Sequence, residues 1–259
     1  HRNRRPAGMR RRRRFRGSAA AVVCVPADPN LLQSALRPLL KLPLKEIVAV
    51  VLGESCPDLL AAVSAVPKVR TVFLPDEHDE GRGRAAGAGK VQADAVLFAD
   101  GWRPGKPARL AAFLKACGRG TDVALNNITP HLGTFHRWDR GFRMAAFLNM
   151  AFHRRDLGAS SLLVPPFALS RRALKALGPQ RLASPLQAQA AAFRRGLHVQ
   201  VAGYVPLSSA AKAYAARQAD IRQYAAAWRE ALQNRGHRLS FPDRIRRRSV
   251  LTDGLTANV

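Results

Sequence analysis

The chain has 259 residues, 47% of them hydrophobic, which is enough to bury the core of one ordinary α/β domain. Its formal net charge of +26 favours anionic partners such as nucleotides, sugar phosphates, acidic lipid surfaces or nucleic acid. No apolar run approaches the roughly 18–20 residues of a membrane span. The three cysteines lack CxxC spacing, which argues against a disulfide framework or a zinc site and favours a reduced, cytoplasmic setting.

Charge and composition divide the chain into four parts. Residues 1–17 carry nine arginines and no acid, so we expect a self-repelling, disordered tail that could dock on an anionic membrane. Residues 18–205 hold alternating strand and helix patterns. Residues 206–235 are expected to pack a C-terminal helix on that domain, and residues 236–259 form a second basic tail.

The first half of the body alternates strand-type and helix-type patterns. The expected strands cover residues 19–25, Glu46–Leu52, 70–74 and 93–102. The expected helices between the first three strands cover residues 31–40 and 58–66. Either Asp28 or Asn30 would cap the first of these helices through its side-chain oxygen.

An acidic loop and a glycine-rich segment precede the fourth strand. Residues 75–80 place four acids around His78. Consecutive residues rarely converge on one ion, so the pattern favours a solvated loop. Residues 81–89 are expected to be a glycine-rich loop running into a helix that packs tightly on the sheet. They fit no Walker or dinucleotide fingerprint, but Arg82 and Arg84 could reach a pyrophosphate near the helix start.

The fourth expected strand ends in Asp100-Gly101-Trp102. In open α/β sheets, ligands bind beyond the carboxyl ends of the strands, so Asp100 stands where a ligand would arrive. A carboxylate at this place can hold a metal ion or a ribose hydroxyl, or it can bind nothing. The choice among these three alternatives decides most of what the sequence says about function.

The second half continues the alternation, which predicts a mostly parallel sheet with helices on both faces. The expected strands cover residues 122–126, 162–164 and 197–204. The expected helices cover Pro107–Cys117, 170–174, 185–195 and 212–233, with Ser170 as a cap. Residues 129–156 interleave aromatic, histidine and arginine residues, and part of them should form a helix that buries Phe142, Ala146, Phe147 and Met150. The three histidines of this stretch match no common metal-ligand spacing.

The order of these pieces resembles family 2 glycosyltransferases of the GT-A fold over roughly residues 18–205. The residues that carry the resemblance in the first half are Val25-Pro26-Ala27, Gly53-Glu54-Ser55, Arg84-Ala85-Ala86-Gly87-Ala88 and residues 93–100, which resemble the family's "GDxLLFLDxD" segment. Residues 169–174 and 196–199 resemble the family's late helix and final strand. The basic ending around Phe241-Pro242-Asp243 resembles a subgroup of bacterial relatives.

The resemblance implies that a nucleotide-diphosphate sugar lies across the strand ends. Pro26 and Asp28 would then line the base, beside Gly53. Arg84 would meet the diphosphate, and Asp100 would be the first acid of the DxD motif and a metal ligand. A divalent ion, Mg²⁺ or Mn²⁺, would offset charge on the departing nucleotide, and a carboxylate would deprotonate the acceptor hydroxyl.

The sequence departs from the family pattern at the metal site. Trp102 stands where the second acid of DxD is expected. A metal held by Asp100 alone would be weak, because Mg²⁺ and Mn²⁺ require several oxygen ligands. Arginine and lysine side chains could supply the missing positive charge.

The sequence also departs from the pattern at the catalytic base. The late acid pair of the family aligns with Ser184-Pro185, so no base is visible there. Gln187 and Gln189 can hydrogen-bond but cannot take a proton at neutral pH. Asp139 and Asp156 are alternative carboxylates.

The sequence therefore predicts a cytoplasmic glycosyltransferase-like protein that moves a hexosyl group from a nucleotide-diphosphate sugar to an unidentified acceptor, with contact at the membrane face. The alternative is a non-catalytic GT-A module that binds a nucleotide sugar or a partner protein. The missing acids favour the module, whereas Arg84 and Asp100 favour the enzyme. We do not expect a nucleic-acid partner, because aromatic residues make up only 7% and no known nucleic-acid module is recognised.

Overall fold

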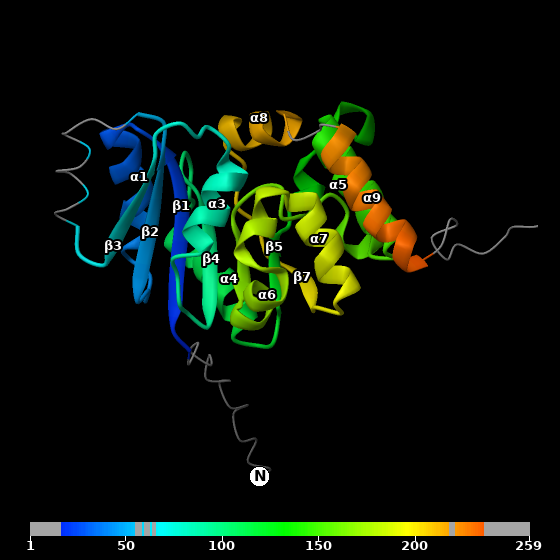
Figure 1. Cartoon of the computed structure of the whole chain (residues 1–259), viewed down its shortest axis with the longest axis horizontal. Coiled ribbons are helices and arrows are strands. Elements are labelled where there is room, and N and C mark those ends of the chain that lie inside the picture. Colours follow the sequence, from blue (N-terminus) through cyan, green and yellow to red (C-terminus); the bar gives the residue numbers. More distant parts are fainter. Residues whose placement is uncertain (1–16, 55–58, 60–62, 64–65, 218–220, 236–259) are drawn as a thin grey trace, which may run out of the picture.

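The computed structural model describes residues 17–54, 59, 63, 66–217 and 221–235. A seven-stranded sheet with the order β3-β2-β1-β4-β6-β5-β7 forms its centre, and helices cover both faces (Figure 1). The strands are β1 (Ala19–Pro26), β2 (Glu46–Leu52), β3 (Val69–Leu74), β4 (Ala95–Asp100), β5 (Val123–Asn126), β6 (Phe167–Ser170) and β7 (Val199–Gly203). The α-helices among the described residues are α1 (Pro29–Leu39), α3 (Glu80–Ala88), α4 (Pro107–Cys117), α5 (Arg140–Ala151), α6 (Arg171–Leu177), α7 (Pro185–Arg194), α8 (Ser209–Arg217) and α9 (Ile221–Arg235). Short 3₁₀ turns cover Thr129–His131, Phe135–Arg137, Arg155–Leu157 and Pro179–Ala183.

The sheet is mostly parallel, which confirms the predicted α/β class. β3, β2, β1 and β4 run parallel to one another. β6 lies antiparallel between β4 and β5, and β7 pairs parallel with β5. The register places Pro26 beside Leu52 and Cys24 beside Asp100. The carboxyl ends of β1, β2 and β4 therefore meet at one edge.

Two apolar cores cover the two faces of the sheet. Val22 of β1 belongs to the core under α3, α6 and α7, whereas its neighbour Val23 belongs to the core under α1 and α4. Because side chains alternate along a strand, a strand buried on both faces needs apolar residues at every position. This requirement explains the uninterrupted apolar run of β1 in the sequence.

The two C-terminal helices pack on different surfaces. Tyr214 and Ala215 of α8 are buried in a cluster with Phe142 of α5. Ala227 and Ala231 of α9 join a separate cluster formed with α5 and α7. Figure 1 shows α8 lying across the end of the sheet where the parallel strands finish. The prediction of one helix over residues 212–233 is therefore wrong, because one continuous stripe cannot face both surfaces.

Two further predictions of elements are corrected by side-chain contacts. The strand expected at residues 162–164 is instead a turn, and the strand that joins the sheet is β6. The amide of Leu162 donates to Gln189 Oε1, so this amide has a partner without pairing with a neighbouring strand. The glycine-rich segment is helical from its start, because the Asp79 carboxylate accepts hydrogen bonds from the amides of Gly81 and Arg82 and caps α3.

The buried face of α5 also differs from the prediction. Phe142 is buried as expected, but Phe147 is 41% exposed. The inward face continues through Ala145 and Leu148, which lie three and six positions after Phe142. Phe147 instead contacts Phe135 edge-on, with ring centroids 6.0 Å apart.

Some predictions fall outside the described part of the chain. The basic tails at residues 1–17, except Gly17, and at residues 236–259 lie there, as does most of the helix expected at residues 58–66. Within the described part, no helix is both long enough and apolar enough to cross a membrane.

Candidate functional site

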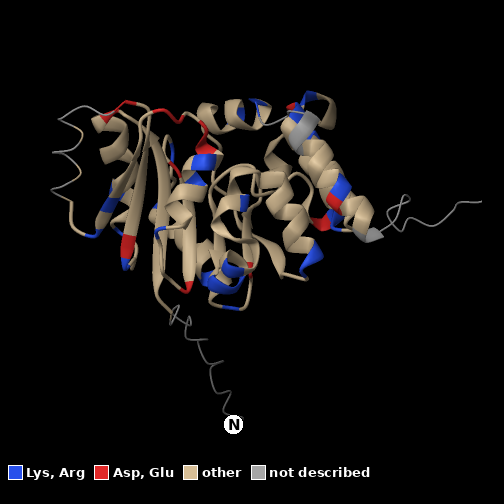
Figure 2. Ribbon diagram, in the orientation of Figure 1, with Lys and Arg blue, Asp and Glu red and all other residues tan. Residues whose placement is uncertain are grey.

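A small cavity opens where β1, β2 and β4 end, and we call it the β1/β2 pocket. Its volume is about 200 Å³. Its walls come from the strand ends (Cys24, Val25, Pro26, Leu52), from the acidic segment and α3 (His78, Glu80), from Trp102 and from α8 (Ala210, Arg217). Figure 2 shows the acidic segment between β3 and α3 passing over this end of the sheet. The pocket thus lies at the place where open α/β sheets bind ligands.

Asp100 lies at the end of β4 and is only 5% exposed. One carboxylate oxygen accepts hydrogen bonds from the amides of Trp102 and Arg103, at 2.8 Å and 3.3 Å. The other accepts a hydrogen bond from the Ser208 hydroxyl at 2.6 Å. The Ser208 oxygen in turn accepts from the amide of Ala211 in the first turn of α8. One oxygen of Asp100 therefore stabilises the turn after β4, and the other connects β4 to the start of α8.

Arg84 is 3% exposed, within α3. Its guanidinium forms an ion pair with Glu80 at 3.0 Å, donates to the carbonyl of Leu163 and lies 4.6 Å from the ring centre of Tyr214. Burial raises the pKa of the Glu80 carboxyl, and the charge of Arg84 opposes that rise. Removing one member of a buried ion pair leaves an uncompensated charge. Within α3, Glu80 therefore stabilises the guanidinium that contacts Tyr214 of α8.

The other predicted nucleotide-binding residues lie around the same edge. Pro26 lines the β1/β2 pocket. Asp28 caps α1, where its carboxylate accepts from the amides of Asn30 and Leu31. Gly53 follows β2 with a φ of +89°, and a side chain there would contact the imidazole of His78. Arg84 and Asp100 lie beneath the pocket and support residues that line it.

The described residues do not offer a divalent metal site in this arrangement. They contain no group of three or more histidine, cysteine, aspartate or glutamate residues placed to hold an ion. Both oxygens of Asp100 accept internal hydrogen bonds, and Trp102, 46% exposed, occupies the position of the second acid. Glu80 is the acid that lines the pocket, and it is paired with Arg84.

The structure separates the candidates for a catalytic base. Asp156 forms an ion pair with Arg154 at 2.7 Å. Gln189 is buried and bonds to the amide of Leu162 and to the side chain of Asn149. Asp139 precedes α5 without capping it through its side chain, and it lines a second pocket. The carboxylate of Asp139 is therefore the candidate placed at a described pocket.

Sequence reasoning missed the contribution of α8. Ala210 and Arg217 line the β1/β2 pocket, and Ser208 bonds to Asp100 across 108 positions of the chain. A serine before a helix signals a cap, and this signal could have found the start of α8. Nothing in the local sequence indicates that the same hydroxyl contacts β4.

The comparisons with known proteins agree on the fold. A structure of glucosyl-3-phosphoglycerate synthase from Mycobacterium tuberculosis is 18% identical, with a TM-score of 0.56, over 88% of this chain and 82% of that one. Another, in complex with Mn²⁺, UDP-glucose and glycerol 3-phosphate, is 17% identical, with a TM-score of 0.54 and the same coverage. A third, described only as a mycobacterial protein, is 16% identical, with a TM-score of 0.54, over 87% of this chain and 76% of that one.

No protein-family model and no curated protein matches the sequence. At identities this low, structural similarity shows the fold alone. The chain therefore has the Rossmann-like GT-A fold of glycosyltransferases, as the resemblance predicted.

Proposed function

We propose that this GT-A protein transfers a sugar from a nucleotide-diphosphate sugar to an acceptor, with the donor bound in the β1/β2 pocket. The observation that carries the proposal is the position of this pocket at the carboxyl ends of β1, β2 and β4. Two of the solved structures with a similar fold are complexes with UDP and with UDP-glucose. Pro26 contributes to the pocket wall from β1.

In this reaction the acceptor oxygen bonds to the anomeric carbon of the sugar. The bond between that carbon and the phosphate oxygen breaks, and the nucleoside diphosphate leaves with the electron pair. The acceptor proton passes to a base. Arg217, which is exposed and lines the pocket, would offset the negative charge on the departing diphosphate. Arg84 would support this wall indirectly, by holding Glu80 and Tyr214.

Divalent metal use is a separate question. Neighbouring structures contain Mn²⁺ together with UDP. Because the described residues of this chain do not fit such an ion, we assign no step to it and attribute the charge compensation to Arg217. The predicted role of Asp100 as a metal ligand remains a prediction.

A second candidate function is a non-catalytic module that binds a nucleotide sugar. The internal hydrogen bonds of Asp100 support this candidate, because a carboxylate held by Ser208 and by the amide of Trp102 is not free for a ligand.

Membership of family 2, bacterial origin, cytoplasmic location and membrane contact also remain predictions.

A titration of the full chain with UDP-, GDP- and dTDP-sugars, with and without Mn²⁺, tests the donor site. We expect one of them to bind, and Arg217→Gln to weaken that binding by roughly tenfold through loss of a charged contact. Arg119→Gln is the matched control, because Arg119 is exposed and forms no ion pair with described residues. Equal affinities in the two variants would remove Arg217 from the site.

Release of nucleoside diphosphate distinguishes the two candidate functions. With a mixture of neutral and anionic hydroxylated acceptors, the transferase should release nucleotide and form a glycosylated product detectable by mass spectrometry. Binding of the donor without release or product would identify the module. Absence of binding to every nucleotide sugar would overturn both.

A further inference from the structure

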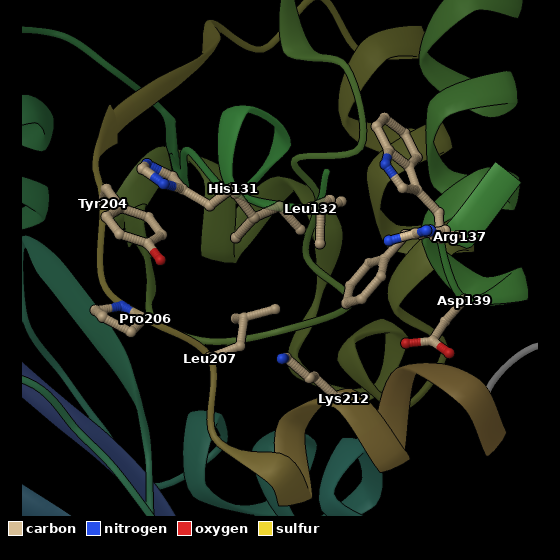
Figure 3. A pocket seen from close by; sticks show the side chains of 11 residues that line it. His131, Leu132, Arg137, Asp139, Tyr204, Pro206, Leu207 and Lys212 are labelled. Carbon is tan, nitrogen blue, oxygen red and sulfur yellow. The ribbon is translucent and has the colours of Figure 1, made fainter. Parts of the chain in front are cut away.

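A second cavity, which we call the β5/β7 pocket, lies beyond the carboxyl ends of β5 and β7. Its volume is about 250 Å³, slightly below the usual range for small-molecule sites. Ile128, Phe142 and Leu207 form apolar parts of its wall. Figure 3 shows polar side chains converging on the same space from several directions. The pocket therefore suits a small polar ligand.

The charged side chains of this pocket form no ion pairs with one another or with other described residues. Arg137 and Lys212 line it from the 3₁₀ turn before α5 and from α8, and neither forms an ion pair with a described carboxylate. Asp139 occupies the N-cap position of α5, yet its side chain accepts no capping hydrogen bond. Figure 3 shows the ammonium group of Lys212 and the carboxylate of Asp139 directed into the pocket. With two cations and one carboxylate, the pocket carries a net positive charge.

Aromatic contacts hold the walls of the pocket in place. The imidazole of His131 stacks on the ring of Tyr204, with centroids 3.5 Å apart and planes inclined by 17°. The indole of Trp138 donates to the carbonyl of Gly133 at 3.0 Å. Arg109 donates to the Tyr204 carbonyl behind this wall. Walls fixed in this way reduce the ordering cost of binding.

We propose that the β5/β7 pocket is an acceptor site for a small hydroxylated compound that carries a phosphate or carboxylate group. Arg137 and Lys212 would bind the anionic group through charge-assisted hydrogen bonds. Asp139 would accept a hydrogen bond from a ligand hydroxyl. The assignment of this ligand as the acceptor rests on the proposed function, whereas its binding can be tested without any nucleotide.

The position of α8 relates the two pockets. Ala210 lines the β1/β2 pocket and Lys212 lines the β5/β7 pocket. Residues two positions apart in an α-helix are rotated by roughly 200° about the helix axis, so Ala210 and Lys212 lie on opposite sides of α8. The helix is thus a shared wall of the two pockets.

Fluorine NMR of the full chain labelled with 5-fluorotryptophan can observe both pockets at once. The chain has three tryptophans. Trp102 lines the β1/β2 pocket, Trp138 lines the β5/β7 pocket, and Trp228 on α9 is an internal reference. Inorganic phosphate and glycolate are the phosphate and carboxylate probes, and ethylene glycol is the neutral control.

We expect phosphate or glycolate, but not ethylene glycol, to shift the Trp138 resonance in a saturable way. Lys212→Gln and Arg137→Gln should each weaken that binding by roughly tenfold. Lys175→Gln and Arg119→Gln are the matched controls, because both residues are exposed and unpaired among the described residues. The probe with the higher affinity identifies the anionic group of the ligand.

The proposal is overturned if the Trp138 resonance does not respond to either anion, or if the control variants weaken binding as much as the pocket variants do. A nucleotide sugar that shifts only Trp102, with no anion effect on Trp138, would refute this inference and leave the proposed function standing. Anion binding at Trp138 without any nucleotide-sugar binding would instead confirm the anion site and refute its assignment to an acceptor.

Discussion

Asp100 illustrates how a single residue can occupy the expected position and still face inward. Its place at the end of β4 follows from the apolar run before it, and the following Gly101 is required because a Cβ there would overlap the carbonyl oxygen of Cys24. Its carboxylate, however, bonds to Ser208 and to the backbone after β4. The predicted position is confirmed by the structure, whereas the predicted role depends on contacts made far along the chain.

Removal of the Ser208 hydroxyl should loosen α8. Ser208→Ala removes the hydroxyl that donates to one oxygen of Asp100 and that caps α8 by accepting from the amide of Ala211. We therefore expect the free energy of unfolding to fall by about 1–3 kcal/mol. Urea unfolding and faster hydrogen exchange in Ser209–Arg217 measure the effect. Ser209→Ala is the matched control because Ser209 is exposed. Equal exchange in the two variants would contradict the linking role of Ser208.

The thiol of Cys24 should be unreactive in the folded protein. Burial raises its pKa to about 12, so at pH 8 only about one molecule in ten thousand holds the thiolate that reacts. The same cause raises the pKa of Cys117 to about 12. Mass spectrometry after iodoacetamide treatment should find both unmodified in the native state and modified in concentrated guanidinium chloride. Rapid native alkylation of Cys24 at pH 8 would show that the strand ends are open to solvent.

At the scale of elements, α3 depends on glycines where it crosses the sheet. A Cβ at Gly87 would lie 2.5 Å from Val22 Cγ1 and 2.9 Å from Val50 Cγ2. The sequence predicted close packing of this helix, and the structure confirms it. Gly89, at the end of the same helix, is exposed and has more room.

The pair Gly87→Ala and Gly89→Ala tests this packing. The first should lower the free energy of unfolding by about 1–3 kcal/mol, because the added methyl group must displace β-strand side chains in a close-packed core. The second should change it by less than about 0.5 kcal/mol. Thermal and urea unfolding followed by circular dichroism provide the comparison. A neutral Gly87→Ala would mean that the helix can move away from the sheet at little cost.

At the scale of the whole molecule, the positive charge and the basic N-terminal tail predict attraction to anionic surfaces. Residues 1–17 hold nine arginines, and each basic residue near an anionic membrane contributes roughly 1 kcal/mol. Deleting this segment, or replacing the arginines at positions 10–14 by glutamine, should reduce sedimentation with anionic vesicles, most clearly at low salt.

Neutral vesicles are the control for this prediction, and neither form of the chain should sediment with them. Donor binding measured on the shortened chain shows whether the body is still folded. If deletion leaves binding to anionic vesicles unchanged, then the tail is not the attachment and the prediction of membrane docking fails.

The sequence by itself determined the alternating architecture, the bounds of Glu46–Leu52 and Pro107–Cys117, and the GT-A resemblance. The architecture and these bounds depend on local periodicity, capping and apolar runs, which involve residues close together in the chain. The resemblance depends on the order of short segments along the chain. The tertiary structure decided that Asp100 and Arg84 are held inside, that α8 forms a wall of both pockets, and that Asp139 faces a cavity. Those outcomes depend on contacts between residues as far apart as Asp100 and Ser208, which local patterns do not encode.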